Sequence, residues 1–457
     1  MQKSNETQNN GQNVGVDFSR ENKPLVDQQK PPTRVALICP DLLNKYQKRS
    51  KEIRLEEFIG LAGAIRLEII FSEIVKVREI KPATFIGGGY VDELTLKIKE
   101  NDIDLVLVDA SLSPIQQRNL ETRLEAKVLD RTALILEIFG ERAATREGVL
   151  QVELAHLNYQ KGRLVRSWTH LERQRGGGAF TGGPGETQIE SDRRQIQERI
   201  IKLERELEKV AKTRKLQRAP RDAVPFPIVA LVGYTNSGKS TLFNRITNSK
   251  VKAQNLLFAT LDTTVRKAKL PHGREIMLSD TVGFIADLPT DLIAAFRATL
   301  EEVTKADIIL HVRDIASDDH IAQAQDVMAV LNDLGVDAIE TPIIEVWNKI
   351  DLIKNSSEIE NISTLGQVEI NVEISAVTGQ GVENLLEEIE AVLAQSSNIF
   401  DIIVPHEKSE DIGWLYAHGE VLERCEPDEK GTKFTVRITP RYSDIFQTRF
   451  ENQLSVA

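Results

Sequence analysis

The sequence predicts an α/β protein of several domains, and three observations carry that prediction. The chain has 457 residues, which at roughly 150 residues per domain suggests about three domains. Two long regions alternate short apolar runs with helix-like segments, a pattern typical of mostly parallel sheets. Between them lies a stretch of helical spacing rich in Arg and Glu, and short alternating runs follow near the C-terminal end.

Composition narrows the class of protein. Hydrophobic residues make up 41% and charged residues 28% of the chain, which fits a soluble globular protein. Cys39 and Cys425 are the two cysteines, so a disulfide framework is excluded and a reducing compartment is favoured. No signal peptide and no run of 18 apolar residues is present, so we expect a cytoplasmic protein without stable membrane insertion. A peripheral position at the membrane stays open. The net charge of −11 means that any nucleic-acid contact must come from local patches.

The N-terminal third predicts a tail and a first domain. Residues 1–33 are rich in Asn, Gln, Lys and Pro, which predicts a disordered tail. Residues 34–158 predict the N-terminal α/β domain, because the strand-like run RVALICP is followed by helical spacing over 54–65 and by a second apolar run over 102–112. The glycine cluster TFIGGGYVDEL at 84–94 is typical of a strand-to-helix turn.

Residues 159–222 predict a basic helical-hairpin subdomain. From Ile196 onward apolar residues follow a 4-3-4-3 rhythm within a predicted helix over 186–216, and LQVELAHLNYQKGRLV predicts the other half of the hairpin. Residues 159–221 contain 16 Lys and Arg against 8 Asp and Glu. Prolines at 220, 225 and 227 then predict a linker.

The stretch RGGGAFTGGPGE at 175–186 predicts a long loop at the tip of this hairpin. It has no GK[ST] and no preceding strand, and Pro184 removes a backbone donor that a phosphate-binding loop would use. Tyr159, Trp168 and Phe180 lie among arginines, an arrangement that suits RNA backbone and unstacked bases. A solvated helix face with a disordered tip explains the composition equally well.

Residues 226–397 predict a Ras-like P-loop GTPase domain. GYTNSGKS matches GxxxxGK[ST], follows an apolar strand directly and precedes a helix, which is the context a phosphate-binding loop requires. We expect Lys239 to reach the β- and γ-phosphates and the Ser240 hydroxyl to bind Mg²⁺. The expected phosphate-binding residues are Gly233, Tyr234, Thr235, Asn236, Ser237, Gly238, Lys239 and Ser240.

Three further motifs end predicted strands in the order that a nucleotide-binding sheet needs. DTVG predicts an Asp that holds the Mg²⁺ shell and a Gly283 N–H that senses the γ-phosphate. In NKID, the Asp351 carboxylate can accept from guanine N1–H and N2–H together, a donor pair that adenine lacks. In SAV, the Ala376 N–H can meet guanine O6. The expected ligand residues are Asp280, Thr281, Val282, Gly283, Asn348, Lys349, Ile350, Asp351, Ser375, Ala376 and Val377.

The segment FATLDTT lies between the P-loop and DTVG. It resembles the first switch of translation-factor-like GTPases, and this resemblance favours Thr260 over Thr263 and Thr264 as the second Mg²⁺ ligand. The expected contact residues here are Phe258, Ala259, Thr260, Leu261 and Asp262. We take Lys239, Thr260 and Gly283 as the catalytic residues.

Two residues bear on the rate of hydrolysis. Phe284 occupies the position after DxxG where Ras-like proteins carry the Gln that orients the attacking water. An apolar side chain cannot polarise water, so we expect slow turnover until a partner orders the site. Asn236 is compatible with a K⁺ site within the P-loop, and equally with a simple turn-forming Asn.

The stretch GGGAFTGGPGETQIESDRR, followed by a basic helix, GYTNSGKSTLFN, FATLDTT, DTVGFIADLP and NKID, resembles the HflX family of GTPases over about residues 35–397. The resemblance implies a factor that binds the large ribosomal subunit, splits or rescues stalled or dormant ribosomes under stress, and hydrolyses GTP with Mg²⁺. It also implies that the Gly-rich helical region contacts ribosomal RNA. We expect a monomer. Residues 398–457 are predicted as a small β-containing module beyond the resemblance.

Two other functions fit the motifs. One is a GTP-driven remodeller of free structured RNA. The other is a regulatory switch that binds a protein partner at the membrane surface, in which hydrolysis only resets the switch.

Overall fold

The computed structural model describes most of the chain from Pro32 onward, and the described residues from Thr33 onward belong to one structural unit. The tail expected at 1–33 lies outside the described residues except for its last two. The described ranges are 32–43, 49–65, 67–174, 184–222, 226–249, 257–258, 263–286, 302–336, 341–353, 368, 370–395, 398–427, 431–438 and 440–451.

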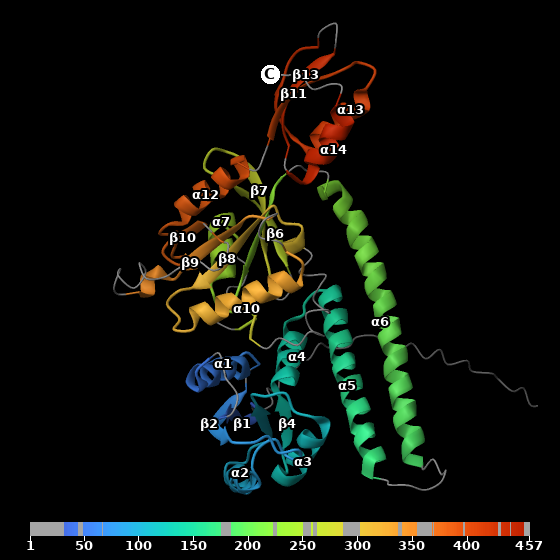
Figure 1. Ribbon diagram of the computed structural model, residues 1–457, viewed down its shortest axis with the longest axis vertical. Helices are drawn as coiled ribbons and strands as arrows, with labels where there is room; N and C mark the ends of the chain where they lie inside the picture. The colour runs from blue at the N-terminus through green and yellow to red at the C-terminus, as the bar shows by residue number, and fades with distance from the viewer. Residues whose placement is uncertain are drawn as a thin grey trace, which may run out of the picture. The chain divides into compact units, whose positions relative to one another are not determined.

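The N-terminal domain is a four-stranded parallel sheet with helices (Figure 1). Its strand order is β2-β1-β3-β4. Val35 and Leu37 of β1 enter one buried cluster, whereas Ala36 and Ile38 enter another. The continuous apolar run RVALIC therefore reflects a strand covered on both faces. The elements are β1 (Arg34–Leu42), α1 (Lys51–Gly63), β2 (Glu68–Val77), α2 (Gly88–Glu100), β3 (Leu105–Val108), α3 (Pro114–Leu124), β4 (Lys127–Asp130) and α4 (Arg131–Arg142).

The helical hairpin consists of α5 (Arg146–Gln174) and α6 (Pro184–Asp222). Ile200 and Leu203 of the predicted apolar rhythm are buried, and Arg199 of α6 forms an ion pair with Glu153 of α5 at 2.6 Å. One expectation needs correction. The domain boundary placed between residues 158 and 159 falls inside α5, because the helical pattern of α5 continues without a break from the first domain into the hairpin.

The P-loop domain is built on a six-stranded sheet of order β10-β9-β8-β5-β7-β6, in which only β6 is antiparallel to its neighbour. One face packs with α10 and the other with α7 and α12. The strands predicted at GYTNSGKS, DTVG, NKID and SAV are present as β5, β7, β9 and β10, and β6 was not predicted. The elements are β5 (Ile228–Gly233), α7 (Lys239–Thr247), β6 (Thr264–Lys269), β7 (Glu275–Asp280), β8 (Ile308–Asp314), α10 (His320–Asp333), β9 (Ile343–Asn348), η1 (Ile350–Leu352), β10 (Ile370–Glu373) and α12 (Val382–Gln395).

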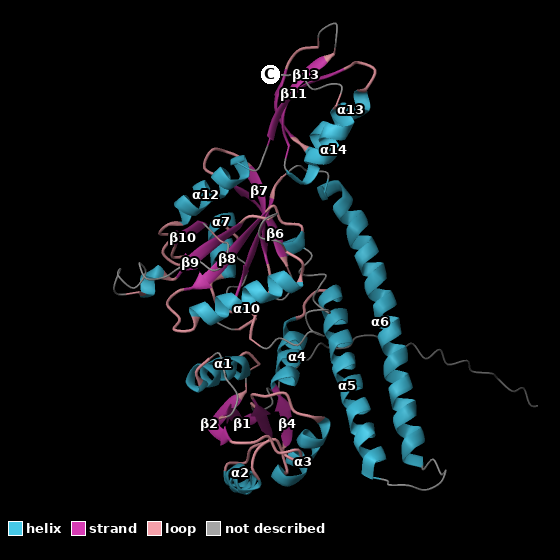
Figure 2. Cartoon of the chain, in the orientation of Figure 1, coloured by secondary structure: helices cyan, strands magenta, loops and turns pink. Residues whose placement is uncertain are grey.

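The C-terminal module is a three-stranded antiparallel sheet of order β11-β13-β12 with two helices (Figure 2). Phe434, Phe446 and Phe450 are fully buried in its core. The predicted small β-containing module is therefore confirmed. Its elements are β11 (Asn398–Val404), α13 (Ser409–His418), β12 (Glu420–Arg424), β13 (Thr432–Ile438) and α14 (Pro440–Phe450). Within the described parts of the chain, no helix combines the length and apolarity needed to cross a bilayer.

Candidate functional site

The P-loop forms a tight turn between β5 and α7, and its glycines are required by space. Gly238 has φ +98°, and a Cβ there would lie 2.1 Å from Asn348 Nδ2. A Cβ at Gly233 would lie 2.3 Å from the Val312 carbonyl oxygen. Asn236 also adopts a left-handed conformation, with φ +61°, which asparagine tolerates better than most residues. The loop thus presents backbone where side chains would block a ligand.

Lys239 begins α7 and folds back over the loop. Its Nζ donates to the carbonyl oxygens of Gly233 at 3.0 Å and Tyr234 at 2.7 Å. The side chain is buried, so a cation lies beneath the loop, at the N-terminus of a helix. This is the charge arrangement that binds phosphate groups.

Ser240 and Asp280 lie side by side. The Ser240 hydroxyl donates to Asp280 Oδ2 at 2.7 Å, and Asp280 is fully buried at the end of β7. A hydroxyl and a carboxylate oxygen are ligands that Mg²⁺ prefers. Nearby, Thr235 Oγ1 and Ser237 Oγ are buried and lack a hydrogen-bond partner among the described residues. Buried hydroxyls without partners are costly, and a bound ligand would satisfy them. These residues fit a nucleotide with Mg²⁺.

The segment DTVGFIA runs against the P-loop. The Phe284 N–H donates to Gly233 O at 3.1 Å, and the Thr235 N–H donates to Phe284 O at 2.7 Å. A Cβ at Gly283 would lie 2.9 Å from Thr235 Cα and 3.1 Å from Lys239 Nζ, so only glycine fits there. The Phe284 ring is buried in the apolar core. It cannot orient a water molecule, in agreement with the expectation from its residue type.

Asn348 connects the NKID loop with the P-loop and with the SAV loop. Its Nδ2 donates to the Ser237 carbonyl oxygen at 2.8 Å, and its Oδ1 accepts from the Ala376 N–H at 2.9 Å. Lys349, with φ +70°, pairs with Asp314 at 2.6 Å. Asp351 in η1 is exposed, as a base-reading carboxylate must be before the base binds. The Ala376 N–H is engaged by Asn348, so its contact with guanine O6 stays a prediction.

The first switch is described only in part. Ala259, Thr260, Leu261 and Asp262 lie outside the described residues. Phe258 is described, and its ring packs edge-to-face on Phe139 of α4 with centroids 4.6 Å apart. The Phe258 side chain therefore contributes to the apolar core, and its contact with the ligand stays a prediction. Ser375 is fully buried, whereas Val377 is exposed at the loop surface.

The burial of Lys239 leads to a prediction about proton uptake when GDP binds. Burial lowers the pKa of Lys239 to about 8, and Asp280 opposes the shift. An unfolded lysine has a pKa of about 10.4, so between these values the unfolded chain binds more protons and this group makes stability rise with pH. A phosphate ligand needs the charged form. We therefore expect GDP binding at about pH 9 to take up close to one proton.

Calorimetry of GDP binding in two buffers with different ionisation enthalpies measures this uptake. The same titration at about pH 7.2 is the control, because Lys239 is already mostly protonated there and the GDP phosphates are largely ionised. Binding at the higher pH without proton uptake would show that Lys239 does not change its charge state.

Comparison with known proteins decides the family. Four family models match successive parts of the chain: "GTP-binding GTPase N-terminal" over 52–140, "GTP-binding GTPase Middle Region" over 142–221, "50S ribosome-binding GTPase" over 228–349 and "HflX C-terminal domain" over 362–455. A relative from Magnetococcus marinus, described as GTPase HflX, is 45% identical over 429 residues, which cover 94% of this chain and 98% of the relative. The chain belongs to the HflX family of GTPases.

Membership in the HflX family makes the protein a GTPase that binds GTP with Mg²⁺. The Escherichia coli GTPase HflX is 44% identical over 350 residues, or 76% of this chain and 81% of that relative. A solved structure of a GTP-binding protein from Sulfolobus solfataricus in complex with GDP covers 79% of this chain and 99% of its own, with 25% identity and a TM-score of 0.42.

The HflX models correct one expectation. Residues 398–457 were expected to extend beyond the family resemblance, but the C-terminal domain of the HflX family matches 362–455. This module carries little sequence signal, because its strands are short and it has no nucleotide-binding motif.

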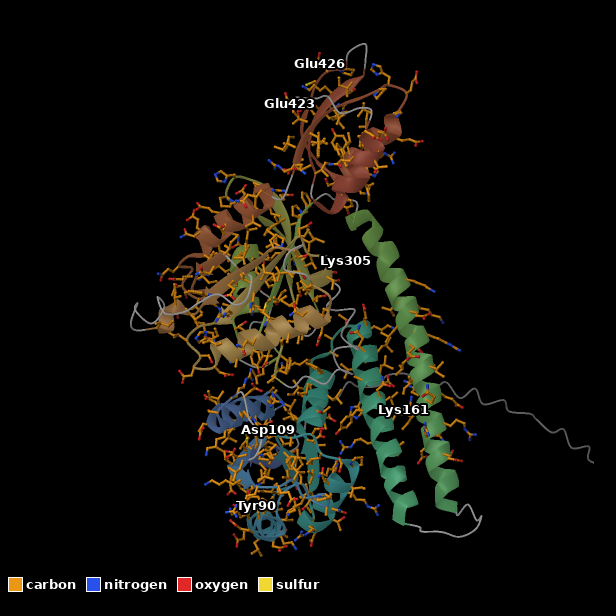
Figure 3. All side chains as sticks on the ribbon, in the orientation of Figure 1. Tyr90, Asp109, Lys161, Lys305, Glu423 and Glu426 are labelled. Carbon is orange, nitrogen blue, oxygen red and sulfur yellow. The ribbon has the colours of Figure 1, made fainter. Side chains whose placement is uncertain are left out.

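Tyr234 has a second role that sequence motifs did not indicate. Its side chain is buried, and its hydroxyl donates to Glu57 of α1 at 2.5 Å. The same oxygen accepts from Arg49 and from the Ala286 N–H, both at 2.7 Å. Arg131 donates to the Ala286 carbonyl oxygen at 3.2 Å. It also pairs with Asp109 (Figure 3) at 2.8 Å. The P-loop and the segment after DTVG are thus joined to buried charges of the N-terminal domain.

A Y234F variant tests the weight of this contact. Losing the hydroxyl leaves the Ala286 N–H without its buried acceptor and removes one of the hydrogen bonds to Glu57, which keeps Arg49. We therefore expect a loss of about 1–3 kcal/mol in the free energy of unfolding. Urea unfolding measures the loss. Tyr416, which is exposed on α13, supplies the control variant Y416F. Equal stability of the two variants would show that the Tyr234 hydroxyl contributes nothing.

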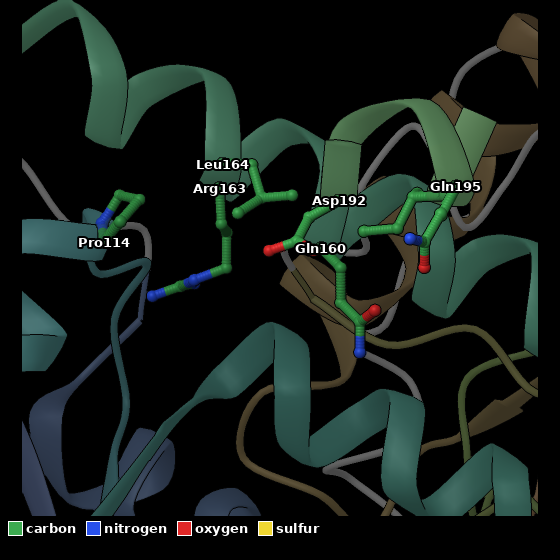
Figure 4. Close-up of a pocket in the computed structure, with 7 residues that line it drawn as sticks. Pro114, Gln160, Arg163, Leu164, Asp192 and Gln195 are labelled. Carbon is green, nitrogen blue, oxygen red and sulfur yellow. The ribbon is translucent and has the colours of Figure 1, made fainter. Parts of the chain in front are cut away.

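The position of Tyr159 in the hairpin differs from the expectation. Tyr159 was expected among RNA-contacting side chains, but its hydroxyl donates to Asp130 at 2.8 Å, and Arg163 pairs with the same carboxylate at 3.1 Å. Both residues therefore anchor α5 to the N-terminal domain. A groove of about 530 Å³ remains between α5, α6 and the start of α3, lined by Pro114, Arg163 and Asp192 among others (Figure 4). The side chains of Trp168 and Phe180 lie outside the described residues.

Proposed function

We propose that this GTPase of the HflX family binds the large ribosomal subunit and uses GTP to split or rescue stalled or dormant ribosomes. The family model over 228–349 carries the description of a 50S ribosome-binding GTPase, and the resemblance over the Gly-rich stretch points the same way. The affinity of the protein for the ribosome would depend on bound GTP. Hydrolysis of GTP by water to GDP and phosphate would then release the protein from the ribosome.

The observation that carries the proposal is the placement of Phe284. Its side chain is 3% exposed, and its backbone N–H and carbonyl oxygen both form hydrogen bonds with the P-loop. The position that would orient water is therefore filled by a buried apolar side chain. An enzyme with this arrangement requires a partner to complete its site, and for a factor that works on ribosomes the ribosome is the natural activator.

Each site residue has a proposed role. Lys239 stabilises charge that develops on the phosphates, and the Gly283 N–H senses the γ-phosphate. Ser240 and Thr260, supported by Asp280, would hold Mg²⁺, which supplies further charge stabilisation when bound. Asp351 reads guanine through N1–H and N2–H. The remaining P-loop, NKID and SAV residues shape the backbone around the ligand.

The partner surface is proposed to be residues 159–221. The described, exposed side chains of α6 carry both signs, with Arg193, Arg194 and Lys202 close to Glu198 and Glu204. The positive excess of the region therefore comes mainly from its two ends, residues 161–175 up to the start of the Gly-rich stretch and residues 212–221 before the linker. These ends are the proposed contacts with ribosomal RNA.

The first test is GTP turnover with and without purified large subunits, in K⁺ and in Na⁺ buffers. Stimulation by subunits is the expected result. Normal GTP binding with unchanged turnover would contradict the ribosome proposal and favour a switch that answers to a protein partner. A rise confined to K⁺ would support a K⁺ site at Asn236, and equal rates in the two buffers would remove it.

A second test separates ribosome contact from GTP chemistry. Deleting residues 175–185 should abolish stimulation by subunits and leave intrinsic turnover unchanged. Stimulation that survives the deletion would show that the Gly-rich stretch makes no productive RNA contact. Stimulation by free structured RNA alone would favour the RNA-remodelling alternative.

A further inference from the structure

A buried ion pair lies inside the nucleotide sheet, next to the base-reading loop. Arg313 of β8 pairs with Glu345 of β9, and their side chains are 1% and 0% exposed. Both point to the face of the sheet that α10 covers, because Ile309 and Ile343, two or four residues earlier on the same strands, belong to the core on that face. Neither residue belongs to a nucleotide-binding motif.

Two more side chains complete this cluster. The Trp347 Nε1–H donates to Glu345 Oε2 at 2.8 Å. The Arg313 Nη2 lies 3.1 Å from Nδ1 of His320, the first residue of α10. Burial, followed by the Arg313 charge, lowers the pKa of His320, so a neutral imidazole accepts this hydrogen bond. One guanidinium thus serves Glu345 and His320 through different nitrogens.

The cluster lies directly beneath the residues that form the base site. In the parallel pairing of β8 with β9, Arg313 lies opposite Trp347 and Asp314 opposite Asn348. Asp314 forms an ion pair with Lys349 at 2.6 Å, and Asn348 hydrogen-bonds to the P-loop and to the SAV loop. The Trp347 carbonyl oxygen also accepts from the Ile374 N–H at 2.8 Å, which fixes the strand that leads into SAV.

Stability alone does not account for such a pair. Taking two charges out of water costs about as much as their attraction returns, and apolar side chains of similar volume often stabilise a core equally well or better. Directional hydrogen bonds, however, define one register, and a binding site must be held to within about 0.5 Å. We infer that Arg313, Glu345 and Trp347 are positioning residues that set the geometry of guanine recognition at NKID.

The inference rests on the proposed reading of guanine by Asp351, so its test measures that contact. The readout is the preference for GDP over inosine diphosphate, which lacks the exocyclic amino group that Asp351 would bind. The test variant R313M/E345L/W347F replaces the cluster with apolar side chains. We expect it to fold with unchanged or higher thermal stability. We also expect it to lose about tenfold in this preference, because the preference depends on one hydrogen bond that a displaced Asp351 would make poorly.

Two further variants make the result unambiguous. R313K keeps the charge but loses the planar donor set that reaches both partners, so a smaller loss of preference is expected. This variant still tests the inference if the triple variant does not fold. K267M/E275L removes an exposed ion pair of the β6–β7 hairpin and should leave the preference unchanged. An unchanged preference in the folded cluster variants, or an equal loss for both nucleotides, would overturn the inference.

The variant D351N separates this failure from failure of the proposed site. If D351N abolishes the GDP preference while the cluster variants retain it, Asp351 reads guanine and the cluster only packs. If D351N retains the preference, the proposed role of Asp351 is wrong and the positioning inference falls with it.

Discussion

A D351N variant is expected to lose its preference for guanine over xanthine nucleotides by a factor of about 10⁴. The Asp351 carboxylate accepts two hydrogens from guanine, whereas an asparagine amide would offer a donor of its own to the carbonyl oxygen at C2 of xanthine. The loss is large because a buried polar edge of the base would be left unpaired. Competition binding of GDP and xanthosine diphosphate measures the change.

The control for this prediction is D333N. Asp333 ends α10 in the same domain and is exposed, so D333N removes the same charge without touching the base loops. It should bind both nucleotides as the unmodified protein does. A D351N protein that still prefers GDP over xanthosine diphosphate would contradict the assignment of Asp351.

A K239A variant is expected to hydrolyse GTP about 10²–10³-fold more slowly, the usual cost of removing one preorganised charge-stabilising donor. Lys239 is the buried cation of the P-loop, and it also joins the Gly233 and Tyr234 carbonyl oxygens. Single-turnover measurement of phosphate release at saturating GTP isolates the chemical step from nucleotide binding.

The matched control is K267A, which removes a lysine that is exposed on β6. It should retain full turnover. Thermal unfolding of K239A must accompany the rate measurement, because the lost backbone contacts could loosen the loop. A folded K239A protein with turnover within about threefold of normal would show that Lys239 does not act on the transition state.

The sequence predicted those parts of the site that depend on local backbone geometry. GYTNSGKS, DTVG, NKID and SAV each follow a strand, and the contacts of Gly238 and Gly283 show why glycine is needed at those positions. The apolar residue type of Phe284 also sufficed to predict that it cannot orient water. These inferences need only a few neighbouring residues, and the fold preserves that neighbourhood.

Contacts between distant residues were harder to predict. Tyr234 occupies a P-loop position that tolerates many side chains, and its partners Arg49 and Glu57 lie more than 170 residues away in the sequence. Tyr159 and Arg163 looked available for RNA because composition cannot tell a paired charge from a free one. The Arg313–Glu345 pair did leave a signal, because each is a charged residue within a largely apolar strand and the two charges are opposite on neighbouring strands.

The unbroken α5 has a mechanical consequence. At 1.5 Å per residue its 29 residues form a rod of about 43 Å. Its first half is embedded in the core through Val152 and Ala155 and is fastened at Tyr159, and its other end adjoins the Gly-rich stretch. A tilt of about 5° at the embedded end would move the far end by roughly 4 Å. The N-terminal domain and the hairpin therefore share one continuous helix, and a truncation at residue 158 would cut through it.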